Sequence, residues 1–152
     1  MPKLDLTSIK GRTGSGYPAP YNQGMELRSV QGLSEPGGLT QFGANIVTLA
    51  PGGKSALRHW HEEQDEFAYI ISGALTLVDD AGETPLAPGD CVAFPKGDGN
   101  GHQIANTTDQ DGSFLVIGTR TATEVGHYPD ANLRVEIADD QFTWLHKDGT
   151  PY

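Results

Sequence analysis

Short apolar runs separated by turn residues form the dominant pattern along the middle of the chain. Apolar and polar positions alternate in several of them, as in EFAYIISG at residues 66–73, which is typical of strands with one buried face. Strands of about five residues, with turns such as PGG at 51–53 between them, favour an all-β sandwich or small barrel. The expected strands lie at residues 41–50, 54–61, 66–73, 91–95, 102–106 and 112–120, with one more at the start of residues 74–90.

The two ends of the chain show less periodicity than the middle. Residues 1–38 are rich in Gly, Pro and Ser and predict an extended N-terminal arm, with one or two short strands within MELRSVQGL. Residues 39–120 predict the barrel. Residues 121–152 are polar and carry four aromatic residues, so we expect a partly irregular C-terminal extension that packs on the barrel or on a second subunit.

Charge and composition narrow the possible partners. The formal net charge is −10 with only ten Lys and Arg, and such an acidic surface repels phosphate backbones and anionic membranes. No apolar run approaches the roughly 20 residues that cross a bilayer, and the first residues lack a signal-peptide pattern. We therefore expect a cytoplasmic protein that binds neither nucleic acid nor membrane. The single cysteine, Cys91, is expected to be buried and inert.

Residues 59–66, HWHEEQDE, contain the candidate chemistry. His59 and His61 project from the same face of a strand, and a turn at EEQD would bring Glu66 back to that face. His102 opens a later strand directly after a glycine-rich loop. Three imidazoles and one carboxylate suit Fe, Mn, Ni, Cu or Zn better than Ca or Mg, which prefer all-oxygen ligands. The alternative is that these are ordinary surface or core residues without a metal.

Two longer segments around these residues resemble the conserved motifs of the cupin superfamily. Residues 53–73 match G-x5-H-x-H-x4-E-x6-G at every fixed position, and residues 89–106 are similar to G-x5-P-x-G-x2-H-x3-N. The second motif has two extra residues, Gly99 and Asn100, before its histidine. The resemblance covers roughly residues 40–120. It implies a double-stranded β-helix (a jelly-roll barrel) that holds one divalent transition metal through His59, His61, Glu66 and His102.

Several neighbouring residues are assigned less specific roles. Ala68 and Ile70 share the parity of Glu66 and are expected to line the cavity, whereas Phe67 and Tyr69 are expected to be packing residues. Asn106 is expected to hydrogen-bond to the backbone. Outside the motifs, His127 and His146 are interpreted as surface histidines, with a lid or acid/base role as the alternative.

Neither the fold nor the metal defines the reaction. Our preferred interpretation is a metal-dependent enzyme acting on a small polar metabolite, by isomerase, lyase or dioxygenase chemistry, and the catalytic base is not identified. The alternative is a non-catalytic cupin that binds or senses a sugar or another small ligand. A phosphorylated sugar is disfavoured at this stage, because the cations near the motifs are Arg58 on the opposite face, Lys96 in a loop and Arg120 at a strand end.

We predict a homodimer in solution, because a small barrel exposes strand edges that invite pairing and the N-terminal arm is long enough to cross to a second subunit. Light scattering at micromolar concentration should give twice the chain mass of 16.2 kDa. A monomeric mass would contradict the prediction.

Overall fold

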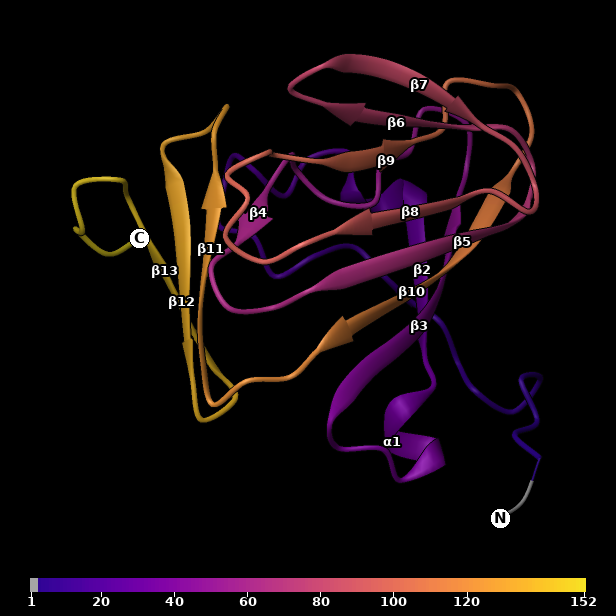
Figure 1. Ribbon diagram of the computed structural model, residues 1–152, viewed down its shortest axis with the longest axis horizontal. Helices are drawn as coiled ribbons and strands as arrows, with labels where there is room; N and C mark the ends of the chain where they lie inside the picture. The colour runs from indigo at the N-terminus through magenta and orange to yellow at the C-terminus, as the bar shows by residue number, and fades with distance from the viewer. Residues whose placement is uncertain (1–2) are drawn as a thin grey trace.

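Strands account for most of the ordered structure in the computed structural model, which describes residues 3–152 (Figure 1). The all-β expectation is confirmed. The elements are β1 Arg12–Thr13, η1 Met25–Leu27, β2 Arg28–Gly32, α1 Ser34–Gly37, β3 Phe42–Leu49, β4 Trp60–His61, β5 Glu66–Ser72, β6 Leu75–Asp79, β7 Gly82–Leu86, β8 Cys91–Phe94, β9 Gln103–Ala105, β10 Gly112–Thr119, β11 Thr123–Tyr128, β12 Leu133–Ala138 and β13 Gln141–Leu145. Within residues 3–152 no helix has the length and apolar character needed to span a membrane.

Two antiparallel sheets form the barrel. The larger has the order β1-β2-β3-β10-β5-β8 and the smaller the order β7-β6-β9, so strands distant in sequence lie side by side, as in a jelly roll. The longest pairing joins β3 to β10, from Phe42↔Thr119 to Leu49↔Gly112. In Figure 1 the smaller sheet lies at the top of the view, above β8 and β5 of the larger sheet.

Alternate residues of both sheets fill the interior. The main core cluster draws on the larger sheet for Val47, Leu49, Ala68, Ile70 and Phe114, and on the smaller sheet for Leu75, Leu86 and Ile104. Since successive side chains of a strand point to opposite faces, each of these strands also presents an outer face.

The outer face of β5 corrects two expectations. Phe67 and Tyr69 were expected to be packing residues, yet they are 40% and 43% exposed, and Ile71 beyond them is 44% exposed. Cys91 was expected to be buried, but it pairs with Tyr69 across β5 and β8 and is exposed as well. The parity assigned to β5 was right: Ala68 and Ile70 point inward and are fully buried.

The C-terminal residues are more regular than expected. Strands β11, β12 and β13 form an antiparallel meander that pairs with β4, in the order β13-β12-β11-β4, and stands at one end of the barrel strands in Figure 1. The extension is partly irregular as expected, since residues 146–152 follow the last strand, but its three strands were not predicted. The buried positions of β11 are Glu124, Gly126 and Tyr128, so the hydrophobic alternation that announces a strand is absent from its sequence.

The N-terminal arm lies on its own chain. Strand β1 pairs with β2, through Arg12↔Val30 and Thr13↔Ser29, and β2 pairs with β3. Tyr17, between these two strands, packs with Tyr128 and Trp144 of the C-terminal meander. The N-terminal arm and the C-terminal meander thus pack against each other through these aromatic rings. The homodimer remains a prediction, although the arm extends the sheet of its own chain.

Glycines of the two motifs serve different geometric needs. Gly73 has a φ of +77°, and a Cβ there would lie 2.6 Å from the Cα of Gly112, so this turn requires glycine twice over. Gly53 has no positive φ, but a Cβ would lie 2.8 Å from the carbonyl oxygen of Leu27. The backbone of η1 therefore approaches the turn after β3 too closely for any side chain.

Asn106, at the end of the second motif, holds three segments together. Its side-chain nitrogen donates to the carbonyl oxygens of Leu49 (2.9 Å) and Gln110 (2.7 Å), and its Oδ1 accepts from the backbone nitrogen of Thr108 (3.0 Å). The residue is 1% exposed. The expected backbone-bonding role matches this geometry.

Replacing Asn106 by alanine is expected to lower the free energy of unfolding by about 2–4 kcal/mol, because the buried carbonyl of Leu49 loses its donor. Urea denaturation followed by tryptophan fluorescence would measure the change. Asn22→Ala, at an exposed position, is the matched control and should stay within about 0.5 kcal/mol of the parent protein. Equal midpoints for the two variants would contradict the role assigned to Asn106.

Candidate metal centre

The backbone brings the four candidate ligands together from three places in the chain. His61 ends β4 and Glu66 begins β5, with the turn at residues 62–65 between them, so the parity is reset as expected. His59 and His102 form an antiparallel bridge, in which each backbone nitrogen donates to the other's carbonyl oxygen at 3.1 and 2.9 Å. This bridge places two imidazoles side by side, with ring centroids 4.9 Å apart.

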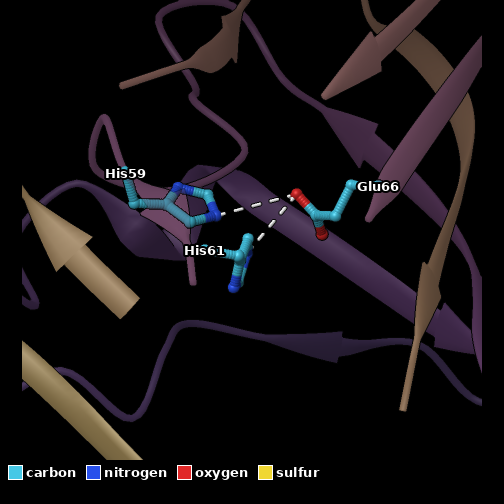
Figure 2. Close-up of side chains that lie close together, drawn as sticks. All are labelled: His59, His61 and Glu66. Carbon is cyan, nitrogen blue, oxygen red and sulfur yellow. Dashed lines mark ion pairs between the residues drawn. The ribbon is translucent and has the colours of Figure 1, made fainter. Parts of the chain in front are cut away.

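Three imidazoles face one carboxylate oxygen. The Oε2 atom of Glu66 lies 3.1 Å from Nε2 of His102, 3.6 Å from Nε2 of His61 and 3.8 Å from Nε2 of His59. Figure 2 shows Glu66 pointing toward His59 and His61, whose candidate ligand atoms all lie within 4.8 Å of one another. Two atoms that each bind one ion at about 2.1 Å, at right angles, are about 3 Å apart. These separations therefore suit a shared divalent metal.

Contacts behind the rings set their orientation. Nδ1 of His59 lies 2.9 Å from the carbonyl oxygen of Leu57, so this nitrogen donates and Nε2 keeps a free lone pair toward Glu66. The ring of His102 stacks on Phe94, with centroids 3.6 Å apart and planes 3° from parallel. Both rings are thus held before any ligand arrives.

The electrostatics of Glu66 and His59 also fit a metal. Burial alone would raise the pKa of Glu66, but contact with His102 and His61 lowers it well below its usual value, so the carboxylate is ionised. Burial lowers the pKa of His59 to about 4, so this imidazole is neutral at pH 7, as a metal ligand must be. Burial also acts on His61, but the neighbouring Glu66 outweighs it and raises the pKa of His61.

The ring nitrogens of His61 give the most direct indication of a metal ligand. Its ring nitrogens are both buried, and neither has a hydrogen-bond partner within the part of the chain that the structure describes. Nε2 faces Glu66, and Nδ1 faces the Oε1 atom of Glu124 at 3.7 Å. A buried polar atom without a partner is costly, and a metal ion at Nε2 would satisfy it. The residues present therefore fit a metal.

Glu124 is a buried acid that the sequence analysis missed. It is 2% exposed, and its two carboxylate oxygens accept the backbone N–H groups of Glu62 (2.8 Å) and Glu63 (3.0 Å). It thereby fixes the turn between His61 and Glu66 and lies behind the His61 ring. Glu124 lies on the same face of β11 as the buried Tyr128, and this spacing was the available sign that it is buried. A charged residue at a core position, however, makes a strand difficult to recognise from its sequence.

The cluster lies at the wall of a cavity of about 270 Å³. Its apolar floor is made by residues of the main core, including Val47, Ala68 and Phe114. Ile70, expected at the cavity, lies in the core instead. Four polar residues that the sequence analysis did not assign also line the cavity: Tyr17, Arg28, Asn45 and Ser55.

The remaining candidates lie elsewhere. His127 stacks on Trp60, with centroids 4.2 Å apart, and bonds to Glu62 at 2.7 Å, whereas His146 stacks on Tyr152 at 3.8 Å. Asn100, one of the two extra residues of the second motif, accepts the backbone N–H of Asp80 at 2.9 Å. The longer loop is thus tied to the β6–β7 turn.

Comparison with known proteins identifies the class. The Cupin domain family matches residues 45–118, and the chain belongs to the cupin superfamily. The jelly-roll fold and the recognised motifs are therefore confirmed. A comparison with curated proteins gives no match.

Solved structures resemble the chain to different degrees. It is 54% identical to a sugar phosphate isomerase of the cupin superfamily from Silicibacter pomeroyi, over 99% of this chain and 96% of that one, with a TM-score of 0.96. It is 27% identical to a candidate sugar phosphate isomerase from Acidithiobacillus ferrooxidans, over 97% and 91% of the two chains, with a TM-score of 0.82. A predicted oxalate decarboxylase from Thermotoga maritima, 21% identical over 78% and 99% with a TM-score of 0.61, shares the fold alone.

Replacing Glu124 by glutamine is expected to weaken binding of Mn²⁺ or Zn²⁺ by about 10- to 100-fold, because the turn between His61 and Glu66 loses one of its acceptors and the His61 ring loses the charge behind it. Competition with a fluorescent chelator would measure the dissociation constant. Glu83→Gln, in the exposed strand β7, is the control and should bind as the parent does. A Glu124→Gln protein with native circular dichroism and unchanged affinity would refute the positioning role.

Proposed function

We propose that this protein is a metal-dependent isomerase acting on a phosphorylated sugar, with the metal held by His59, His61, Glu66 and His102. The observation that carries the proposal is the convergence of three imidazole nitrogens on the Glu66 carboxylate at the wall of a cavity. The choice of reaction is supported by the 54% identical relative, which is described as a sugar phosphate isomerase. Among isomerase, lyase and dioxygenase chemistry, only the first has support of this kind.

The chain's own residues contribute the environment for this reaction. A divalent metal supplies a Lewis acid that polarises a substrate carbonyl or hydroxyl group and favours loss of a neighbouring proton. The fixed rings of His59 and His102 require no rearrangement on binding. The apolar floor around Phe114 limits the water near the reacting end of a small substrate.

The alternative is a non-catalytic cupin that binds a sugar or another small ligand. The same cavity would serve both functions, so turnover alone distinguishes them. The cytoplasmic location and the homodimer remain predictions from the sequence.

The metal is tested first. Protein purified without a metal-affinity tag is expected to contain close to one equivalent of Fe, Mn, Ni, Cu or Zn by elemental analysis. The His59→Ala/His102→Ala double variant should contain none, since half of the proposed ligand set is removed. A folded parent protein that neither carries nor takes up any of these ions would refute the metal site.

The reaction is tested on the metal-loaded protein with triose to hexose phosphates in D₂O. Isomerisation through an enediol exchanges the proton next to the carbonyl with solvent, so proton NMR should show a second isomer and loss of that proton signal. The double variant should show neither. Full metal occupancy without conversion of any of these sugars would favour the binding module.

A further inference from the structure

Arg28 is a cation that lines the cavity. Arg28 is the first residue of β2. It lines the cavity of the histidine cluster together with Val30, which is two residues further along the strand. Three other arginines form ion pairs: Arg58 with Asp80 and Asp130, Arg120 with Glu35, and Arg134 with Glu136. Among residues 3–152, no carboxylate forms an ion pair with Arg28.

The hydrogen bonds of Arg28 are also incomplete. A guanidinium has five N–H donors. Nη1 donates to the carbonyl oxygen of Ser55, whereas Nε is buried and has no partner in the described chain. Burial lowers the pKa of Arg28, but an arginine stays charged in proteins. A half-buried charge without a counter-ion and a buried donor without an acceptor are both costly, and an oxyanion in the cavity would relieve both.

The surroundings of Arg28 suit such an anion. Tyr17, Asn45 and Ser55 add polar groups to the same cavity. Arg28 also lines a second hollow, of about 340 Å³, together with Val30 and residues 12–16 of the N-terminal arm, which include Arg12. The cations that the sequence suggested are placed less well, since Arg58 is paired to two aspartates outside the cavity and Lys96 to Glu63.

We propose that Arg28 is a specificity-determining residue that binds the anionic group of the substrate, a phosphate or carboxylate, while the carbonyl end of the same molecule lies at the histidine cluster. The inference deepens the proposed function and rests on it for the nature of the substrate. A planar guanidinium can bind two oxygens of one oxyanion at once, which an ammonium cannot. Arg28→Lys should therefore recover only part of the binding.

The test uses inorganic phosphate and acetate as probes, with the metal-loaded protein. Titration with each anion, followed by the ¹⁵N resonance of the Arg28 Nε group, should show saturable binding of at least one anion. The preferred anion identifies the source, phosphate or carboxylate. Because the Arg28→Gln variant has no Arg28 resonance, its anion binding is compared with that of the parent by titration calorimetry, and the substitution should weaken binding by about 10- to 100-fold. Arg120→Gln, which alters an exposed arginine, is the matched control and should bind as the parent does.

The metal-free double variant separates this inference from the proposed function. An anion held by Arg28 still binds when His59 and His102 are alanines, whereas an anion held by a metal does not. Anion binding that disappears with the metal, or that Arg28→Gln leaves unchanged, overturns the inference even if the protein is an isomerase. A parent protein that shifts the Arg28 resonance with neither anion also overturns it.

A second readout applies if turnover is found. Arg28→Gln should raise KM for a sugar phosphate by about 10- to 100-fold and change kcat much less, because the anionic group is remote from the reacting carbons. Elemental analysis of the same variant should show an unchanged metal content. A variant that loses kcat and keeps KM would contradict a binding role.

Discussion

A carboxylate inside a barrel must be compensated, and the arrangement around Glu66 follows from this constraint. Its side chain is only 22% exposed, and the isolated charge would favour protonation. Three imidazoles lie within 4 Å of its Oε2 atom and keep it ionised. The neutral imidazole of His59 carries no charge to balance the carboxylate, and a divalent cation would do so. The same side chains that keep the carboxylate ionised therefore also form a ligand set for a metal.

The barrel combines this polar cluster with an ordinary apolar core. Val47, Ala68 and Phe114 belong to the core and also form the floor of the cavity. Substitutions at these positions would therefore change stability and cavity shape together. Phe67 and Tyr69 on the outer face of β5 are exposed and do not line this cavity.

The sequence predicted the local parts of the site better than the long-range ones. The spacing of His59, His61 and Glu66 depends on strand parity and one turn, both of which are visible in a short stretch of sequence. Arg28 was missed because parity divides β2 into two faces without showing which face turns inward when the sheets close. The burial of Cys91 and the packing of Tyr69 were misjudged for a different reason. Apolar character alone does not place a residue inside the protein.

The C-terminal strands were missed for a different reason. Strand prediction depends on apolar residues at alternate positions, and β11 places Glu124 and Gly126 at its buried positions. Gly126 is small because a Cβ there would lie 2.8 Å from a methyl group of Val135. Glu124 is buried because its carboxylate accepts hydrogen bonds from the backbone N–H groups of the turn that follows β4. Such positions are explained by their partners, which the sequence alone does not show.

The hydrogen bonds between Glu124 and the turn at residues 62–63 couple the stability of the C-terminal meander to ligand binding at the histidine cluster. The meander of β11, β12 and β13 joins the barrel through the short strand β4, so its detachment would free both that strand and the turn behind His61. Linkage is reciprocal: any ligand that requires the closed turn also disfavours local opening of the meander. Amide hydrogen exchange in β11, about sixty residues along the chain from His59 and His61, would then slow as the occupancy of the metal centre rises. The C-terminal meander would thus report, through its rate of hydrogen exchange, whether a ligand is bound in the barrel.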